Sequence, residues 1–449
     1  MLMTNSTCTH ERVQNIYSDM ETASTPKRPR VIIVGGGFGG LYAAQALSNQ
    51  AVDITLIDRK NHHTFQPLLY QVALAVLSPG EIASPLRHIL RKARNVQVLL
   101  AEVAGFDTDA QRVKLSDGAQ LEYDYLIVAA GARHAYFGHD EWEADAPGLK
   151  TLEDAVEIRR RLLLAFERAE RETHFTGKQK TLTVAIIGGG PTGVELAGAV
   201  ADLARLALAK DFKAIDTTKT RIQLYEAASR ILGTFSEESS RRATRQLQEL
   251  GVEVRTESMV TAVEPGRIKV ADEWIATDVT LWATGVAASP LGNKLGAQTD
   301  RAGRVLIEPD LSVPGHRDIF VIGDMSALTD ANGKPVPGLA AAATQQGKAA
   351  AENILRDLRG AARVPFNYHD RGSMATIGYH RAVAEFGNRK LSGLMAWLLW
   401  SVVHVFLLIG FRSRVAVMSQ WIWAYLTRRG SSPLITEYRT RDSDTKQMN

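Results

Sequence analysis

Residues 30–44 of the chain read RVIIVGGGFGGLYAA, and residues 182–198 read LTVAIIGGGPTGVELAG. Each stretch begins with a short run of mostly β-branched apolar residues, Val31 to Val34 and Val184 to Ile187, without a polar interruption. Such runs are typical of strands that are buried on both faces of a parallel sheet. Glycines follow each run at once and lead into a segment rich in Ala and Leu. Each copy therefore predicts a strand, a tight turn and a helix.

Both turns fit the pattern G-x-G-x-x-G. Its first glycine forms the tight turn, its second lets the backbone approach a pyrophosphate, and its third lets the helix pack on the strand. The six glycines are Gly35, Gly37 and Gly40 in the first copy and Gly188, Gly190 and Gly193 in the second. A pyrophosphate would lie at the N-terminus of each helix, where free N–H groups and the helix dipole favour an anion. The alternative for each copy is an ordinary strand-to-helix turn.

An acidic residue ends the next predicted strand of each copy. Asp58 lies 18 residues after Gly40, and Glu226 lies 33 residues after Gly193 because of an insertion around residues 209–219. In dinucleotide-binding units such an acid binds the ribose hydroxyls and would repel the 2′-phosphate of NADPH. Glu226 therefore favours NADH over NADPH, unless it is only a surface acid at a strand end. Two complete copies predict a protein that binds two dinucleotides.

Composition limits the class of protein. The chain has 449 residues, of which 45% are hydrophobic and 23% charged, enough for two or three folded domains. A formal net charge of +4 and a pI near 9.0 are too mild to indicate a nucleic-acid partner. The one cysteine, Cys8, excludes an internal disulfide, a zinc cluster of cysteines and a redox-active cysteine pair. Residues 1–28 lack an apolar core segment and are expected to form a flexible tail.

The pattern of the two units extends beyond the glycines. Both close on an apolar strand that ends in Ala-Ala-Gly or Ala-Thr-Gly, at residues 123–132 and 279–286. A helix over 152–173 is expected to join them. After the second unit, a further apolar strand ends at Gly323 and Asp324, and a helix with small residues on one face follows. Those small residues suit either the close approach of a flat molecule or tight packing of helices.

The last eighty residues change character. Residues 394–411 read LMAWLLWSVVHVFLLIGF, and four of the seven tryptophans lie between 397 and 423. Between Phe386 and Thr436 the segment has basic residues and no acidic one. Apolar helices with Trp and flanking cations suit the interface of a bilayer with anionic headgroups. We therefore expect helices that lie in the membrane surface; a transmembrane helix and a buried core or dimer helix are the alternatives.

With both glycine patterns, Gly323–Asp324 and this tail, the sequence resembles the flavoprotein reductases with two dinucleotide-binding domains, relatives of the pyridine nucleotide-disulfide reductases. Within them it is most similar to the type II NADH dehydrogenases, single-chain NADH:quinone oxidoreductases that do not pump ions. The resemblance covers residues 30–435. It is carried by GGGFGG, FQPLLYQVA, GGGPTGVELAG, FVIGDM, ATQQGK and the tail from YHDRGSMATIGYHRAV to GFRSR.

The resemblance implies that the first unit binds FAD. The glycines would contact its pyrophosphate, Asp58 and Arg59 the adenosine ribose, Val103 the adenine, and Asp324 the ribityl chain. The full set of implied FAD contacts is Gly35, Gly36, Gly37, Phe38, Gly39, Gly40, Asp58, Arg59, Val103, Ala130, Gly131, Asp324 and Ala341.

The resemblance also implies that the second unit binds NADH, with Glu226 at the ribose. Glu195 matches the family's glutamate beside the nicotinamide and the flavin, and is the implied catalytic residue. The alternative is a favourable charge in the first turn of a helix. The set of implied NADH contacts is Gly188, Gly190, Thr192, Gly193, Glu195, Glu226 and Gly285.

For the quinone, the resemblance points to Gln345 and Gln346. The family commonly has Ala-Gln where this chain has Ala340-Ala341, so the first of two glutamines proposed for quinone contact is missing. This departure weakens any quinone assignment in the segment.

The resemblance implies an α/β fold with two Rossmann-like domains, the NADH domain inserted in the FAD domain, and an amphipathic membrane-anchoring region. The expected ranges are 29–150 and 298–365 for FAD, 151–297 for NADH, and 366–449 for the membrane. Hydride would pass from NADH to FAD and electrons to ubiquinone or menaquinone, at the cytoplasmic face of the inner membrane, without ion pumping and without a metal ion.

Other functions and assemblies have to be compared with the same sequence features. Sulfide:quinone and disulfide reductases use cysteine pairs, which this chain lacks. A reductase of a small electron-carrier protein and a membrane-docked redox sensor that binds nucleotides without fast turnover are the alternatives. A homodimer through the C-terminal region is a further expectation left open.

Overall fold

The computed structural model describes residues 28–330, 333–427 and 433–435, so the expected tail over residues 1–28 lies almost wholly outside the described residues. The first glycine pattern belongs to a six-stranded sheet in the order β20-β21-β9-β1-β2-β5, parallel except for β20. Its strands are β1 (Arg30–Val34), β2 (Asp53–Asp58), β5 (Val96–Leu100), β9 (Tyr125–Val128), β20 (Ser312–Val313) and β21 (His316–Val321).

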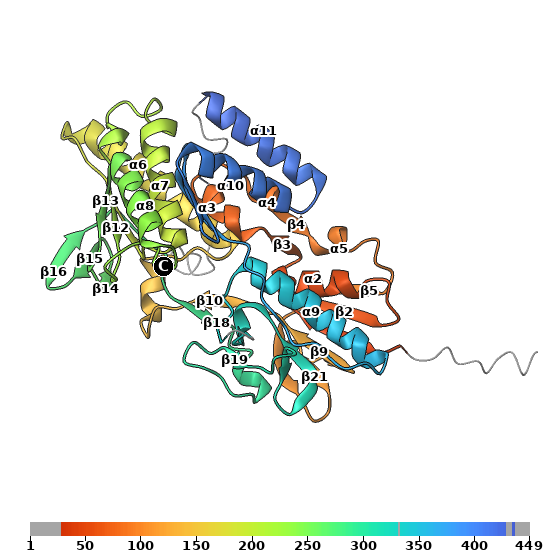
Figure 1. Ribbon diagram of the computed structural model, residues 1–449. Coiled ribbons are helices and arrows are strands. Elements are labelled where there is room, and N and C mark those ends of the chain that lie inside the picture. Colours follow the sequence, from red (N-terminus) through yellow and green to blue (C-terminus); the bar gives the residue numbers. More distant parts are fainter. Residues whose placement is uncertain (1–27, 331–332, 428–432, 436–449) are drawn as a thin grey trace, which may run out of the picture.

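The second glycine pattern belongs to a separate parallel sheet in the order β13-β12-β11-β17. Its strands are β11 (Thr183–Ile187), β12 (Arg221–Tyr225), β13 (Val252–Arg255) and β17 (Val279–Trp282). After β17 the chain returns to the first sheet, where β21 pairs with β9. Figure 1 shows the two sheets in different parts of the molecule. The predicted fold class, with one dinucleotide-binding unit inserted in the other, is therefore confirmed, while the exact domain boundaries stay predictions.

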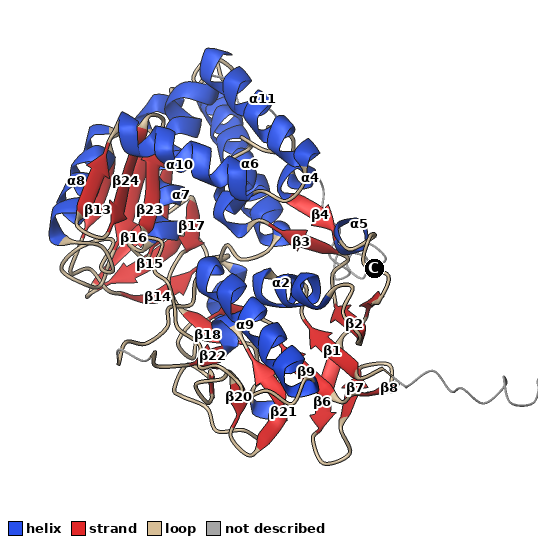
Figure 2. Cartoon of the chain, turned by 45° about the vertical axis from the view of Figure 1, so that its right-hand side comes forward, coloured by secondary structure: helices blue, strands red, loops and turns tan. Residues whose placement is uncertain are grey.

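The helix with small residues is α9 (Ala340–Leu358), which packs along α2 (Phe38–Leu47) beside the first sheet (Figure 2). A Cβ atom at Gly347 would lie 2.2 Å from the carbonyl oxygen of Gly39, so the two helices approach as closely as their backbones allow. Of the two uses that the sequence left open for these small residues, the structure shows tight helix packing.

Four further helices cover the second sheet and the region beside it. The expected linking helix over 152–173 is confirmed and runs three residues further. A capping box of Thr151 and Asp154 fixes its start, and Gly177, with φ of 65°, ends it. The helices are α3 (Leu69–Ala73), α6 (Leu152–Thr176), α7 (Pro191–Asp202) and α8 (Glu237–Glu249).

Short strands complete both units and connect them. β10 and β18 pair antiparallel and join the two units at the point where the chain crosses between them. The short elements are β3 (His62–Thr64), β4 (Ala83–Pro85), α4 (Pro79–Ile82), α5 (Leu86–Ile89), β6 (Val103–Asp107), β7 (Arg112–Leu115), β8 (Gln120–Glu122), β10 (Ala132–His134), β14 (Val260–Glu264), β15 (Arg267–Val270), β16 (Glu273–Ala276), β18 (Val286–Ala288), β19 (Val305–Leu306) and β22 (Ser326–Ala327).

The C-terminal part is a three-stranded antiparallel sheet followed by two helices. The elements are β23 (Ser373–Gly378), β24 (Arg381–Phe386), β25 (Arg389–Ser392), α10 (Leu394–Leu407) and α11 (Phe411–Thr427). The sheet packs on α7, where a Cβ atom at Gly198 would lie 1.7 Å from the carbonyl oxygen of Ile377. Both views place α10 and α11 side by side near α4 (Figures 1 and 2).

The apolar run over residues 394–411 is not one helix. The chain leaves the α conformation at Leu408, with ψ of 138°, and Gly410 has φ of 89°, which suits glycine. Trp400 and Trp421 point into the core, whereas many other apolar side chains of α10 and α11 are exposed. Among the described residues, no helix combines the length and the apolar content that a membrane span requires. The two helices therefore have one buried side and one exposed apolar side.

Candidate active site

The two glycine loops have the same geometry. Gly35 and Gly188 have φ of 103° and 110°, a region that side chains disfavour. A Cβ atom at Gly40 would lie 1.9 Å from the carbonyl oxygen of Gly35, and one at Gly193 would lie 1.8 Å from that of Gly188. The first and third glycines are thus required by the fold itself, whatever the loops bind.

The second glycine of each loop is not required by the fold. Gly37 and Gly190 are the N-cap residues of α2 and α7, with φ near −70°, which any residue adopts. A Cβ atom at either position would meet no protein atom within 4 Å. Space is therefore open directly in front of the two helix N-termini, where a pyrophosphate is stabilised by free N–H groups and the helix dipole. This is the fit expected for two dinucleotides.

The two strand-end acids are held in the same way. Asp58 accepts the N–H of Gly36 at 2.5 Å and the N–H two residues after itself at 2.7 Å. Glu226 accepts the N–H of Gly189 at 2.7 Å and the N–H two residues after itself at 2.7 Å. A carboxylate has about four lone-pair positions, so each acid keeps acceptor capacity after these two bonds. Both carboxylates are fixed beside their glycine loop and can still accept from a ribose.

A long cleft of about 490 Å³ runs from the first glycine loop across the carboxyl ends of the strands. It begins near Val103 and reaches Asp324, Gly338 and Ala343. Of the predicted FAD contacts, those that line it are Gly35, Gly37, Phe38, Gly39, Asp58, Arg59, Val103, Ala130, Gly131 and Asp324. Gly36 and Gly40 serve the loop itself, and Ala341 is not among the lining residues although its neighbour Ala340 is. An elongated cleft that passes along a glycine loop fits FAD.

Lys150 is a charged residue of this cleft that the sequence did not reveal. Its ammonium lies 3.3 Å from Asp324, and both side chains are about four-fifths buried. Lys150 lies two residues before α6, whereas Asp324 follows β21, so the pair joins the segment that leads into the second unit with the end of a strand of the first sheet. His62 also lines the cleft, and burial lowers its pKa, which favours the neutral ring.

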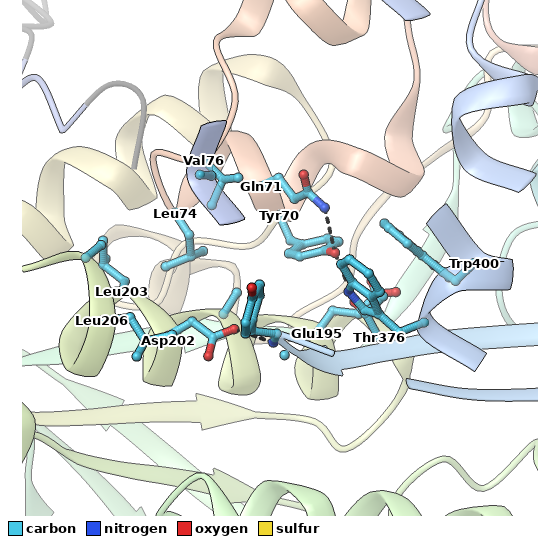
Figure 3. A pocket seen from close by; sticks show the side chains of 16 residues that line it. Tyr70, Gln71, Leu74, Val76, Glu195, Asp202, Leu203, Leu206, Thr376 and Trp400 are labelled. Atoms are coloured by element: carbon cyan, nitrogen blue, oxygen red, sulfur yellow. Dashed lines mark hydrogen bonds between the residues drawn. The ribbon is translucent and has the colours of Figure 1, made fainter. Parts of the chain in front are cut away.

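Glu195 lies in the first turns of α7 but lines a different pocket, between α7 and the C-terminal part. Burial raises the pKa of Glu195 to about 8, partly offset by a hydrogen bond from the backbone of Thr376. Two turns further along α7, Asp202 lines the same pocket and accepts the N–H of Tyr379 at 2.8 Å. Burial raises the pKa of Asp202 to about 7. Figure 3 shows both carboxyl groups on the opposite side of the pocket from Tyr70, with Thr376 and Trp400 toward Glu195.

The raised pKa of Asp202 predicts a pH-dependent effect on stability. An unfolded Asp ionises near pH 4, so above that pH the folded chain is penalised progressively until about pH 7, when its own carboxyl ionises. Asp202→Asn keeps an acceptor for Tyr379 and has no proton to lose. We expect its melting temperature, relative to that of the unchanged chain, to rise from pH 5 to about pH 7 and to level off above that pH. Asp211→Asn, an exposed position, is the control and should show no such trend.

Comparisons with known proteins bear on this arrangement. A family model described as pyridine nucleotide-disulphide oxidoreductase matches residues 29–347, and one described as NDH2 C-terminal domain matches residues 370–430. A type II NADH:quinone oxidoreductase of Mycobacterium tuberculosis, Ndh, is 46% identical over 93% of this chain and 92% of the relative. Another from that organism, NdhA, is 44% identical over the same shares. The chain belongs to the type II NADH:quinone oxidoreductase family.

Solved structures support the same fold. NDH2 of Plasmodium falciparum, in complex with NADH, has a TM-score of 0.83 at 21% identity and covers 91% of this chain and 100% of its own. The sulfide:quinone oxidoreductase of Aquifex aeolicus has a TM-score of 0.69 at 20% identity, covering 89% and 94% of the two chains. Family membership confirms the predicted class of enzyme, while the contact of each site residue stays a prediction.

The two glutamines predicted to contact quinone already have protein partners. The side chain of Gln345 donates to the carbonyl oxygen of His369 and accepts its N–H, both at 3.0 Å. Gln346 is buried, accepts the N–H of Gly323 at 2.6 Å and donates to Ser326 at 3.1 Å. The Gln346 amide holds the backbone at Gly323, which lines the cleft, and the Gln345 amide holds the backbone at His369. A direct contact with quinone at either one would have to compete with these hydrogen bonds.

Other residues of the two sites carry weaker sequence signals. Thr192 is half-buried near the N-terminus of α7, as expected for a residue facing a dinucleotide. Gly285 has φ of 70°, and a Cβ atom there would lie 2.2 Å from the carbonyl oxygen of Ala135, so its role in the fold is established independently of NADH. Asp202 could have been found from its spacing, because seven residues after Glu195 is two turns along the same helix face. Lys150 could not.

Proposed function

We propose that the chain oxidises NADH and reduces a membrane quinone, ubiquinone or menaquinone, through bound FAD and without ion pumping. The observation that carries the proposal is the matched pair of loops, each with open space at a helix N-terminus and a carboxylate fixed beside it. Membership of the family supports NADH as the donor and a quinone as the acceptor.

Bound FAD would supply the redox chemistry that links a hydride donor to a quinone. The chain's residues bind and orient the two dinucleotides. In the proposal the backbone N–H groups at the start of α2 and α7 hold the two pyrophosphates, and Asp58 and Glu226 accept from the riboses. Arg59 and Val103 border the adenosine end of the cleft, and Asp324, held by Lys150, borders the far end.

We propose Glu195 as the catalytic residue, in agreement with its position in the family motif. A carboxyl group with a pKa near 8 holds its proton at neutral pH and can release it, which is the property that a proton-exchanging group needs. The pocket of Glu195 is separate from the residues that line the flavin cleft.

The exposed apolar face of α10 and α11 supports attachment to a lipid surface. Its most exposed members are Met395, Val402, Phe406, Phe411, Ile422, Trp423 and Leu426. Arg412 and Arg414 lie at the junction of the two helices, where cations can reach anionic headgroups. A quinone with a long apolar tail is dissolved in the bilayer, so attachment brings the enzyme to its acceptor. We propose the cytoplasmic face of the inner membrane as the location.

Glu226→Gln is expected to weaken NADH binding about tenfold, because a charge-assisted hydrogen bond to the ribose is lost. The preference for NADH over NADPH should narrow by at least the same factor, since the charge that repels the 2′-phosphate is removed. Initial rates with both nucleotides give the two KM values. Glu273→Gln, an exposed strand position outside both loops, is the control. An unchanged nucleotide preference would contradict the role of Glu226.

The proposed activity is tested by purifying the chain in detergent and following NADH consumption with a short-chain quinone. Turnover well above about 1 s⁻¹ is expected. A slower rate with bound nucleotide would favour a membrane-docked redox sensor. Turnover only with a small electron-carrier protein, and none with quinone, would favour a carrier-protein reductase.

A further inference from the structure

The strand order of the second sheet determines on which side of its glycine loop each half of a dinucleotide would lie. The strands run in the order β13-β12-β11-β17 and are parallel, so their carboxyl ends share one edge. The glycine loop follows β11, between β12 and β17, and Glu226 directly follows β12. A dinucleotide with its pyrophosphate on the loop and its adenosine ribose at Glu226 therefore extends its other half over the end of β17.

A segment of the first unit covers the end of β17. The N–H of Ala135 donates to the carbonyl oxygen of Gly285 at 3.1 Å. A Cβ atom at Gly285 would lie 3.0 Å from Cζ of Phe137, so the tip of this ring lies directly beside the glycine. The second glycine loop is close by, because a Cβ atom at Gly188 would lie 2.7 Å from the Cβ atom of Thr284. The Phe137 ring is thus part of the edge that the second half of a dinucleotide would cross.

The backbone of Phe137 has a conformation that aromatic residues disfavour. Phe137 and Gly138 have φ of 54° and 96°, and the N–H of His139 donates to the carbonyl oxygen of Tyr136 at 3.0 Å. Two positive φ angles in a row are typical of the type I′ turn, in which Asn, Asp or Gly is favoured at the first central position. A bulky ring at this position costs conformational energy. The turn by itself gives no reason for a phenylalanine.

Burial of the ring does not offset this cost. The Phe137 ring is 70% exposed and meets the Trp282 ring on one side, with centroids 6.2 Å apart. The preceding side chain, that of Tyr136, is buried. Val286, which follows Gly285, is also largely exposed. Single exposed apolar side chains are common on protein surfaces, but these two flank one glycine at a predicted nucleotide edge.

The same region leads to the cleft of the first unit. β10 and β18 form a two-stranded ribbon, and Figure 1 shows it between the two sheets. One end of the ribbon lines the flavin cleft with Gly131, Ala132, Arg133 and Ser289. The other end contains Val286 and lies beside the Phe137 turn. The half of a dinucleotide that extends over β17 would therefore point along this ribbon toward the flavin cleft.

We propose that Phe137 is a binding residue for the nicotinamide half of NADH, with its ring against the nicotinamide ring and Val286 beside it. The inference rests on the proposed function, because it requires NADH on the second loop. A ring that is exposed in the free chain gains burial and stacking when a flat ring lies on it. This contact offsets the cost of the turn. The adenosine half lies on the other side of the loop, toward β12.

The test compares two nucleotides that share the adenosine half. Tetrahydro-NAD, an NADH analogue with no hydride to transfer, carries a ring derived from nicotinamide, whereas ADP-ribose ends at the second ribose. Both are titrated calorimetrically into the full chain with bound FAD in detergent. Phe137→Asn should weaken the binding of tetrahydro-NAD about tenfold, because the contact between the rings is lost. The affinity for ADP-ribose should stay the same.

The variants separate binding from folding. Asparagine is favoured in the turn, so the melting temperature of Phe137→Asn should not fall. Phe137→Tyr keeps the ring and should keep the affinity for tetrahydro-NAD. Phe175→Asn is the matched control, because Phe175 is at least as exposed but lies in the last turn of α6. It should change the affinity for neither nucleotide.

Two results would overturn the inference while the proposed function stands. Equal weakening of tetrahydro-NAD and ADP-ribose by Phe137→Asn would mean that the residue shapes the loop and does not contact the nicotinamide ring. Unchanged affinity for both nucleotides would mean that the ring contacts neither. If neither nucleotide binds to the unchanged chain, the proposed function is wrong and the inference falls with it.

Discussion

Gly190→Ala is expected to weaken NADH binding at least a hundredfold while FAD remains bound and the melting temperature is unchanged. In the structure a methyl group at this position meets no protein atom within 4 Å, and the backbone angles suit alanine. The fold therefore tolerates the change, and the stability of the chain without nucleotide should not fall. Only a ligand lying directly on the loop would collide with the new methyl group. A hundredfold loss corresponds to about 2.7 kcal/mol.

The measurement is the dissociation constant of NADH by fluorescence, together with the visible spectrum and the melting curve. Gly37→Ala is the mirror variant, because the same open space lies in front of the first loop. It should lose FAD instead. Gly80→Ala, in α4 and also free of neighbours, is the control. Normal NADH affinity in Gly190→Ala would mean that no pyrophosphate lies on the second loop.

Phe406→Asp combined with Ile422→Asp is expected to lower partitioning onto anionic vesicles about a thousandfold. The two side chains are 72% and 57% exposed on the apolar face of α10 and α11. Each substitution removes about 1.5–3 kcal/mol of free energy gained by burying an apolar side chain in lipid, and it adds a charge. Both positions face away from the core, so the double variant should oxidise NADH with a water-soluble quinone as fast as the unchanged chain does. Vesicle sedimentation gives the partition coefficient.

The matched control places the same charges elsewhere. Phe175→Asp with Met259→Asp changes two side chains of similar exposure, 78% and 65%, in the second unit. This pair should leave partitioning unchanged. If Phe406→Asp with Ile422→Asp still binds vesicles but changes the mass in solution, the face mediates dimer formation and the proposal of a lipid surface is wrong.

The features that the sequence predicted well are local ones. A β-branched run followed by G-x-G-x-x-G specifies a strand, a turn and a helix. Gly35 and Gly188 take backbone angles that side chains disfavour, and a Cβ atom at Gly40 or Gly193 would collide with a backbone oxygen. The strand-end acids follow from the same local geometry. The insertion of one unit in the other was implied by the family resemblance, and the pairing of β21 with β9 agrees with it.

The features that the sequence did not predict depend on contacts between distant segments. Lys150 pairs with Asp324 across 174 positions, and Tyr70 meets Thr376 across 306. The hydrophobic periodicity of a sequence contains no information on such long-range pairs. The small residues of α9 fitted two uses, and the structure shows Gly347 packed against α2 while Ala340 and Ala343 line the cleft. The break between α10 and α11 depends on Gly410, whose angle the apolar pattern does not reveal.

We propose that one chain holds two dinucleotides, one on each glycine loop, close enough for hydride transfer. Anaerobic addition of NADH to the purified protein tests it most directly. We predict one FAD per chain, bleached by one equivalent of NADH within a turnover time and restored by a quinone. A colourless protein, or a bound flavin whose absorbance NADH leaves unchanged, would contradict the account.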